Sequence, residues 1–305
     1  MYAKQLHVRL CSVLSLPVVV VALFAYELYA FNVTFADAVL APSTTVSGLL
    51  LFVCFNVCWA LGLTSYIRCC VTSPGLVPEQ WSLDNEVTAM REKRGYKPGV
   101  ITLCRKCNLA RPERAHHCSI CERCIMRFDH HCPWVGNCVG IQNHKYFILF
   151  TGYITVATVA TVIYAVSGIA ELFEWAEFIA GAKKKMGSGD QPTHFYSGIV
   201  VAAFVALLVC GLFFGHVYFA FANYTSLEMG FHDRNPYDIG YIANAEQILG
   251  PLSVSWLVPT APKRTVDGFS YPTKPTKRST AQTSREELQL IGRPEPSPES
   301  AENAV

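Results

Sequence analysis

Long runs without charged side chains divide the chain into apolar and polar segments. Residues 38–67, 146–170 and 191–227 contain no Asp, Glu, Lys or Arg, and residues 10–31 contain only Glu27. Because an α-helix needs about 20 apolar residues to cross about 30 Å of hydrocarbon, each run can hold one membrane-spanning helix. We expect these four helices at about 10–31, 46–67, 147–169 and 198–221.

Composition indicates the class of protein, and the distribution of charge indicates its orientation in the membrane. The chain is 51% hydrophobic and only 16% charged, which is typical of a membrane protein and not of a soluble domain. A net charge of +2 gives no reason to expect a nucleic-acid partner. Twenty-two of the 25 Lys and Arg lie before the first helix, between the second and third, or after the fourth. The positive-inside rule therefore puts both termini and the long central loop in the cytosol.

These patterns predict an all-α polytopic membrane protein with four transmembrane helices and five segments. An N-terminal hairpin of helices and a C-terminal one enclose the cytosolic loop, and a motif-bearing segment and a proline-rich tail follow. The tail holds seven of the 17 prolines and has no apolar periodicity, so we expect it to be disordered. In order, the segments are 1–67, 68–146, 147–222, 223–258 and 259–305.

Cysteines and histidines in the loop predict two zinc sites. Seven of the 13 cysteines fall between residues 104 and 138. One set has the spacing C-x2-C-x9-H-x6-C, and a second set repeats it 14 residues later. Zinc takes four sulfur or nitrogen ligands, and four protein ligands make a closed site that stabilises the fold and does not activate water. The sets are Cys104, Cys107, His117 and Cys124, and Cys118, Cys121, His131 and Cys138.

This partition leaves one cysteine of the cluster, Cys132, without a metal. Asp129 and His130 precede it, whereas the first copy has Ala115 and His116 at the corresponding positions. His130 can take the thiol proton and Asp129 can orient the imidazole, which is the composition of an activated nucleophile. We therefore expect Cys132 to be the attacking group.

The residues Asp129-His130-His131-Cys132-Pro133-Trp134 resemble the signature of the DHHC family of protein S-acyltransferases (palmitoyltransferases). The likeness covers about residues 8–250. Two later segments resemble further family motifs: Thr225-Ser226-Leu227-Glu228, similar to Thr-Thr-x-Glu, and Asn235-Pro236-Tyr237-Asp238-x-Gly240, with Asn244 and Gly250 behind it.

The resemblance implies a two-step transfer. Cys132 takes a long acyl chain from acyl-CoA and passes it to a cysteine of a membrane-associated protein at the cytosolic face. Structural zinc, acyl-CoA and such proteins are then the cofactor, co-substrate and partners, and the Golgi or endoplasmic reticulum is the expected membrane, with the plasma membrane open. Thr225, Ser226, Glu228 and Asn244 are expected to support the site.

Two positions depart from the family pattern. Ser226 stands where the family has a second Thr, and it keeps a hydroxyl that can bond toward Asp129. Ser73 in Ser73-Pro74-Gly75 stands where the family has Asp, and it loses a carboxylate. Neither change touches the nucleophile.

Substrate contacts are expected from five further residues. Arg111, Arg114 and His116 lie among the ligands, where they can meet CoA phosphates or anionic lipid headgroups. Trp134 suits the mouth of an acyl cavity or an interfacial anchor. Ala157, about three turns into the third helix, is small, so we expect chains of about 16 carbons and longer to fit.

Two other classes of protein remain open from the sequence: a non-enzymatic zinc-containing membrane adaptor and a transporter. A transporter needs paired ionisable groups within its helices, and only Glu27 and His216 offer themselves. An adaptor does not need a free thiol beside Asp-His. The sequence thus favours the enzyme.

Overall fold

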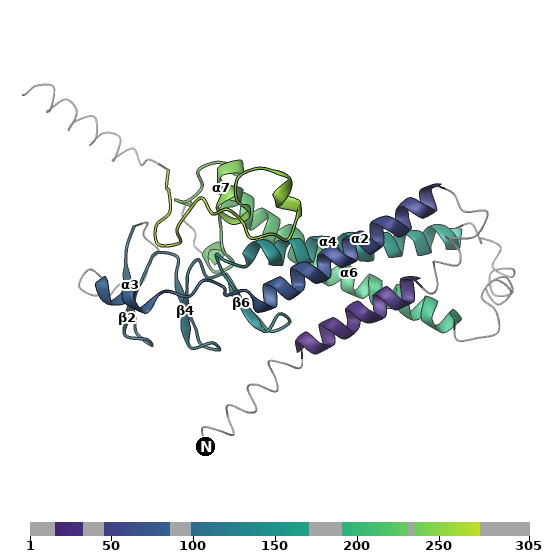
Figure 1. Ribbon diagram of the computed structural model, residues 1–305, viewed down its shortest axis with the longest axis horizontal. Helices are drawn as coiled ribbons and strands as arrows, with labels where there is room; N and C mark the ends of the chain where they lie inside the picture. The colour runs from purple at the N-terminus through teal and green to yellow at the C-terminus, as the bar shows by residue number, and fades with distance from the viewer. Residues whose placement is uncertain (1–15, 33–45, 86–98, 171–190, 231–234, 275–305) are drawn as a thin grey trace, which may run out of the picture.

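The computed structural model describes residues 16–32, 46–85, 99–170, 191–230 and 235–274. Long helices form a bundle at one end of the molecule: α2 (Val46–Val71), α4 (His144–Ala170) and α6 (Gln191–Ala222), with the helix Leu16–Asn32 beside them (Figure 1). Within these helices, Gly48–Val71, His144–Ile163 and Ser197–Ala222 are long and apolar enough to cross a membrane. The predictions of helices at 46–67, 147–169 and 198–221 are confirmed. Residues 10–15 of the first predicted helix lie outside the described part of the chain.

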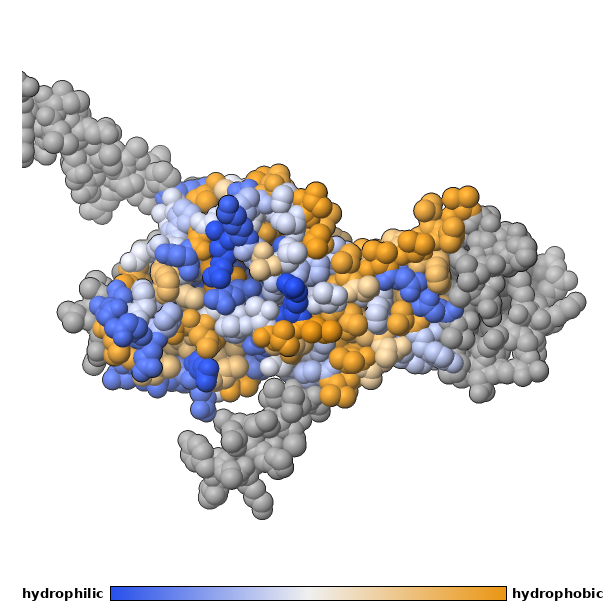
Figure 2. Space-filling view, in the orientation of Figure 1, coloured by the Kyte–Doolittle hydropathy of each residue, from blue (hydrophilic) through white to orange (hydrophobic). Residues whose placement is uncertain are grey.

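The helix α4 is the inner member of the bundle, in contact with both α2 and α6. Its apolar window is 61% buried, whereas the windows of α2 and α6 are each 17% buried and leave most of their side chains on the outside. Figure 2 shows these outer apolar side chains along the helices, and hydrophilic ones gathered over the opposite end. Such an exposed apolar surface is stable in lipid and not in water.

The cysteine-rich loop adds short strands to the helical chain, so the all-α prediction is wrong between residues 102 and 139. Three two-stranded antiparallel hairpins follow one another along the chain and lie toward the end of the molecule opposite the helix bundle (Figure 1). Their strands are β1 (Thr102–Cys104), β2 (Leu109–Arg111), β3 (His116–Cys118), β4 (Arg123–Ile125), β5 (His130–Cys132) and β6 (Asn137–Val139). Three-residue strands are too short to show alternation of apolar and polar residues, which is why the sequence pattern did not predict them.

Shorter elements connect the hairpins to the bundle. They are α3 (Glu79–Asp84), the 3₁₀ turn η1 (Glu228–Gly230), α7 (Tyr241–Leu249) and the 3₁₀ turn η2 (Val254–Leu257). Helix α7 packs on the end of α6, where the Asn244 side chain donates to the carbonyl of Phe221 (2.8 Å). The segment 235–258 is thereby fastened to the bundle.

The prediction of a disordered tail is wrong for residues 259–274, which pack against the hairpins. Tyr271 is 7% exposed and lies in an apolar cluster with Met126 and Ile141. Phe269 stacks on Trp81, with 5.2 Å between ring centroids. Isolated aromatic residues in a proline-rich stretch supply this burial without any helical or strand period. Residues 275–305 lie outside the described residues.

The Ser73-Pro74-Gly75 segment connects the end of α2 to the hairpins. Gly75 has φ +99°, a conformation that favours glycine, and its carbonyl accepts from the Met126 amide (2.7 Å). The Ser73 hydroxyl accepts from the Gly75 amide (3.3 Å). Ser73 therefore supplies a hydrogen-bond acceptor to this turn without a carboxylate.

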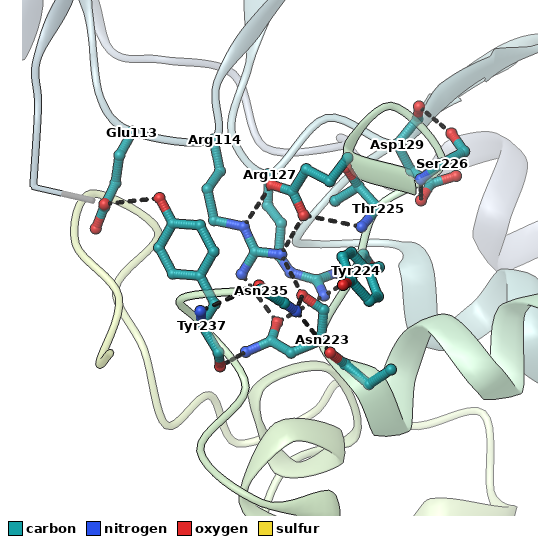
Figure 3. Close-up of polar contacts among 12 residues, drawn as sticks. Glu113, Arg114, Arg127, Asp129, Asn223, Tyr224, Thr225, Ser226, Asn235 and Tyr237 are labelled. Atoms are coloured by element: carbon teal, nitrogen blue, oxygen red, sulfur yellow. Dashed lines mark hydrogen bonds and ion pairs between the residues drawn. The ribbon is translucent and has the colours of Figure 1, made fainter. Parts of the chain in front are cut away.

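A buried ion pair joins the hairpins to the segment after α6. Arg114, 1% exposed, donates from Nε and Nη2 to the two carboxylate oxygens of Glu228 (2.9 and 2.7 Å). The same guanidinium also bonds the side chain and the carbonyl of Asn223 (Figure 3). It lies over the ring of Tyr237, 4.3 Å from the centroid. A bidentate pair of this kind fixes orientation as well as distance.

Removing one partner of this pair should destabilise the protein strongly. Arg114→Ala leaves Glu228 buried without its counterion, which typically costs about 3–5 kcal/mol. The exposed pair Lys274–Asp238, 2.6 Å apart, is the matched control, and Lys274→Ala should cost less than about 1 kcal/mol. Thermal unfolding of the two variants in detergent measures the difference. Equal melting temperatures would show that the buried pair adds no stability.

Candidate active site

The three hairpins are copies of one unit displaced by 14 residues. Each begins its turn at the end of its first strand, at Cys104, Cys118 and Cys132. Four residues later each turn has a positive φ, at Asn108, Glu122 and Gly136. The turns Cys104–Cys107 and Cys118–Cys121 carry two thiols each, whereas the third has Val135 at the place of the second thiol.

Each metal-binding group takes its ligands from two neighbouring hairpins. A first group combines the turn thiols of one hairpin with a cross-strand His and Cys of the next, and a second group repeats the arrangement one hairpin further on. The four ligand atoms of each group lie within 4.8 Å of one another. The groups are Cys104, Cys107, His117 and Cys124, and Cys118, Cys121, His131 and Cys138, which are the two sets that the spacing predicted.

The donors and distances of both groups fit a tetrahedral zinc ion. In the first group His117 Nδ1 lies 3.1 Å from Cys107 Sγ, and in the second His131 Nδ1 lies 3.5 Å from Cys138 Sγ. Zinc bonded at about 2.0–2.3 Å separates its ligands by roughly 3.3–3.8 Å, so the second distance fits directly and the first needs His117 and Cys107 to move apart by a few tenths of an ångström. Three thiols and one imidazole are a donor set that zinc prefers. Both groups can therefore hold a metal ion.

Cys132 lies at the first-thiol position of the third hairpin, where no fourth hairpin follows to complete a metal site. It is 7% exposed and belongs to an apolar cluster with Tyr66 of α2 and Phe147 of α4. Two contacts bring its turn to the end of α2. The Tyr66 hydroxyl donates to the carbonyl of Trp134 (2.9 Å), and the Asn137 side chain donates to three carbonyls at the end of α2, those of Cys69, Cys70 and Thr72 (3.2, 3.1 and 2.9 Å).

Asp129 and His130 form a close pair beside this thiol. The Nδ1 atom of His130 lies 2.7 Å from Asp129 Oδ2, and His130 and Cys132, two residues apart on β5, share one face of that strand. Burial opposes the charged form of His130, but its hydrogen bond to Asp129 and the nearby Cys132 thiol raise its pKa to about 9. Burial likewise opposes ionisation of Asp129, yet the bond to His130 and the neighbouring His144 and His216 hold its pKa well below its usual range.

The segment after α6 fixes Asp129 from the other side. The Ser226 amide donates to Asp129 Oδ1 (3.0 Å), and the Ser226 hydroxyl donates to the Asp129 carbonyl (2.6 Å), as Figure 3 shows. The hydrogen bond expected from the Ser226 hydroxyl is therefore present. Glu228 accepts from the Thr225 amide (2.9 Å) and binds Arg114, so it holds this turn on the hairpins.

The five residues expected to contact the substrates lie in different surroundings. Arg111 donates to the Thr102 hydroxyl (2.9 Å) and is half-buried. Arg114 is buried against Glu228 and Asn223. Burial, followed by the positive charge of Arg111, lowers the pKa of His116 to about 4. Trp134 is 50% exposed, and Ala157 is 2% exposed in a cluster with Phe31 and Phe55.

Two buried residues beside Asp129 were not predicted as part of the site. His144, the first residue of α4, and His216 of α6 lie with Asp129 so that their ligand atoms are within 4.8 Å of one another. From the sequence, His216 stands out only as an ionisable group within an apolar helix. Nothing in the sequence relates it to His144, 72 residues away, because that relation is made by the packing of α6 on α4.

Comparison with known proteins agrees with this geometry. Residues 99–231 match the family model described as DHHC palmitoyltransferase. The chain is 31% identical over 247 residues to a probable protein S-acyltransferase 12 of Arabidopsis thaliana, which covers 75% of this chain and 81% of the relative. It is 46% identical over 139 residues to palmitoyltransferase ZDHHC7 of Mus musculus, covering 44% and 42% of the two chains. Identity to palmitoyltransferase ZDHHC3 of Homo sapiens is 47% over 110 residues, 36% of each chain.

The interleaved cysteine groups, the Asp-His pair beside a metal-free cysteine and these matches lead to one conclusion: the chain belongs to the DHHC palmitoyltransferase family and is a protein S-acyltransferase.

Proposed function

We propose that Cys132 is the nucleophile of this S-acyltransferase, acylated by a long-chain acyl-CoA and deacylated by a cysteine of a membrane-associated protein. The observation that carries the proposal is the hydrogen bond of His130 to Asp129, with His130 on the same face of β5 as Cys132. A nucleophile, a base and a group that orients the base form the arrangement expected for nucleophilic catalysis.

The proposed first step forms a thioester on the enzyme. His130 takes the proton of the Cys132 thiol, and the thiolate sulfur attacks the acyl carbonyl of acyl-CoA. The bond between the carbonyl carbon and the CoA sulfur then breaks, and CoA leaves as a thiol with the proton from His130. A pKa of about 9 suits His130 to carry this proton at neutral pH, because Asp129 stabilises the imidazolium.

The second step reverses the chemistry with another thiol. His130, which is neutral once CoA has left, takes the proton of a cysteine thiol of the protein substrate. The resulting thiolate attacks the Cys132 thioester, the bond between the carbonyl carbon and the Cys132 sulfur breaks, and Cys132 regains that proton from His130. His130 stays accessible from one side, with 30% of its side chain exposed, while Asp129 is fully buried. This difference supports a proton carrier that faces substrates and a carboxylate that only orients it.

The acyl chain is proposed to extend among the helices. Cys132 faces Phe147 and Tyr66 of α4 and α2, so an acyl group on its sulfur has apolar neighbours. Farther along α4, Ala157 packs with Phe31 and Phe55, whose rings stack. Ala157 is the small member of this cluster, and a larger side chain at this position would take up room between the helices, which supports a role for Ala157 in chain length.

For the CoA phosphates we retain Arg111 and drop Arg114 and His116. Arg114 is committed to Glu228 and Asn223, and a histidine with a pKa of about 4 is neutral at physiological pH. Arg111 keeps a half-buried guanidinium beside the hairpins. Trp134, half exposed beside Cys132, suits the mouth of the acyl cavity.

The two metal groups are proposed to hold structural zinc. Each would be held by the three thiolates and one imidazole named above, and each would cross-link two hairpins. When bound, zinc supplies folding free energy and takes no part in acyl transfer, since four protein ligands leave no open position.

The proposed topology has four spanning helices, with both termini and Cys132 in the cytosol. Three apolar helices of sufficient length and the shorter helix Leu16–Asn32 support the count, and the lysine and arginine distribution supports the orientation. Acyl-CoA and substrate cysteines would meet the site from that face. The Golgi or endoplasmic reticulum is the proposed membrane, with the plasma membrane as the alternative.

The nucleophile is tested by covalent labelling. Purified protein incubated with an alkyne analogue of palmitoyl-CoA should gain a hydroxylamine-labile label that Cys132→Ser abolishes. His130→Ala should lower the labelling rate by about 10²–10⁴-fold, the usual contribution of a positioned base. A label that persists in the Cys132→Ser protein would contradict the assignment.

The metal assignment predicts opposite outcomes for neighbouring residues. Cys132→Ala and His130→Ala should keep two zinc ions per chain, whereas His131→Ala and Cys138→Ala should lose one and unfold at lower temperature, because only the latter pair are ligands. Elemental analysis of the purified variants gives the count. Loss of zinc from the Cys132→Ala protein would refute the ligand partition.

Chain-length preference should follow the size of residue 157. Ala157→Phe adds bulk next to Phe31 and Phe55, so we expect preference to shift from 16- and 18-carbon chains toward 14 carbons. Competition among the three acyl-CoAs for labelling of wild-type and variant protein measures the shift. An identical profile for both proteins would rule out this depth as the end of the cavity.

A further inference from the structure

We propose that His216 and His144 are positioning residues that, together with Arg127, form a hydrogen-bonded chain holding the Asp129–His130 pair in its reactive arrangement. The inference rests on the roles proposed above for Asp129 and His130. Each of the three residues comes from a different element: Arg127 from the link between β4 and β5, His144 from α4 and His216 from α6.

The direction of every hydrogen bond in the chain follows from its first member. Arg127 Nη1 lies 3.2 Å from His144 Nδ1, and His144 Nε2 lies 3.0 Å from His216 Nδ1. A guanidinium only donates, so His144 Nδ1 accepts and the ring proton of neutral His144 is on Nε2. That proton is donated to His216 Nδ1, which puts the ring proton of His216 on Nε2. Both imidazoles are neutral, each in one tautomer.

This arrangement is incompatible with a third metal site, although Asp129, His144 and His216 are close enough for one. A metal ion bound by His144 Nε2 needs the lone pair of that nitrogen. With Arg127 bonded to Nδ1, the ring would then have to lose both protons. A buried guanidinium next to the group also repels a cation. The three residues are therefore better explained by hydrogen bonding alone.

His216 is the member of the chain that touches the catalytic pair. The centroids of the His216 and His130 rings lie 5.5 Å apart, and His216 Nδ1 lies 4.0 Å from Asp129 Oδ2. Phe147 packs edge-on against both imidazoles, 5.3 Å from His130 and 4.7 Å from His216. His130 is thus confined by Asp129, Phe147 and His216, and its remaining side is open.

The orientation of His216 depends on groups that are themselves fixed. Its ring can rotate about the Cβ–Cγ bond unless Nδ1 is held, and His144 holds it. Arg127, which is fully buried, fixes His144 and is fixed in turn by the side chain of Asn223 (3.1 Å) and the carbonyl of Tyr224 (3.4 Å). The segment after α6 therefore reaches Asp129 by two routes: directly through Ser226, and through Arg127 and the two histidines.

Asparagine and glutamine at position 216 separate a positioning role from simple filling of space. The side-chain oxygen of Asn lies where His has Nδ1, so His216→Asn keeps the acceptor for His144. Gln is closer to His in volume but carries its polar atoms one bond farther out. Positioning predicts that Asn preserves function better than Gln, and space-filling predicts the reverse. Tyr218→Asn, at a 54% exposed position of the same helix, is the matched control.

The measured quantities are the rate of Cys132 acylation at saturating palmitoyl-CoA, the KM for palmitoyl-CoA, the zinc content and the melting temperature. We expect His216→Leu and His216→Gln to lower the rate roughly 10–100-fold with KM within about twofold, since misplacement of a catalytic group by about 1 Å costs about 10²-fold. His216→Asn should stay within about threefold of wild type, and Tyr218→Asn should be unchanged. A Gln variant as active as the Asn variant would overturn the proposal, as would a change confined to KM.

A spectroscopic measurement tests the chain without any acylation. In protein labelled with ¹⁵N-histidine, a correlation between two imidazole nitrogens across an N–H···N hydrogen bond is expected, and it should vanish in His216→Leu protein. Its absence from the wild type, or a signal from a doubly protonated His144 or His216 at pH 7, would overturn the proposal. This result does not depend on which cysteine is acylated, so it separates failure of the chain from failure of the proposed nucleophile.

Discussion

Sharing of ligands between neighbouring hairpins is the constraint on which the cysteine-rich part of the molecule depends. Each metal group takes two thiols from one turn and a cross-strand His and Cys from the next hairpin, so a bound metal ion would join two units whose strands are only three residues long. A fixed displacement of 14 residues gives all three hairpins the same register. The position of the proposed nucleophile follows, because Cys132 is the third member of a series whose first two members belong to groups that can hold a metal ion.

The hairpins would be a separate module without the contacts that attach them to the helices. Asn137 donates to the carbonyls at the end of α2, and Arg114 and Asp129 bind Glu228 and Ser226 of the segment after α6, so the third hairpin is held at the end of the bundle. These contacts are hydrogen bonds and one bidentate ion pair between buried groups, and their directional nature suits them to fix a geometry and not merely a proximity. The Asp129–His130 pair lies where they converge.

The sequence predicted the parts of this structure that leave a local pattern. Charge-free windows gave the helices 46–67, 147–169 and 198–221, the repeated spacing gave both ligand sets, and elimination gave Cys132. None of the three hairpins was predicted, because strands of three residues show no alternation, and Val135 in place of a cysteine also hides the third copy of the repeat. The ordered structure of residues 259–274 was not predicted because it depends on single aromatic residues. The pairing of His144 with His216 was not predicted because the packing of two helices creates it. Long-range polar contacts have no sequence period that could reveal them.

One side chain in the third turn explains how a thiol in a ligand position can stay free of metal. In each of the first two turns a second cysteine lies three residues after the first, so the turn can bind a metal ion through two thiols. Once the first thiol is bound, the second is present at a high effective concentration. Val135, 2% exposed, denies Cys132 that chelate partner. A lone thiol retains only the affinity of one bond, too weak to compete for zinc with the complete four-ligand sites beside it. Beside the lack of a following hairpin, the entropy of chelation thus separates Cys132 from the cysteines of the two metal groups, and it is controlled by Val135, a residue that takes no part in the proposed chemistry.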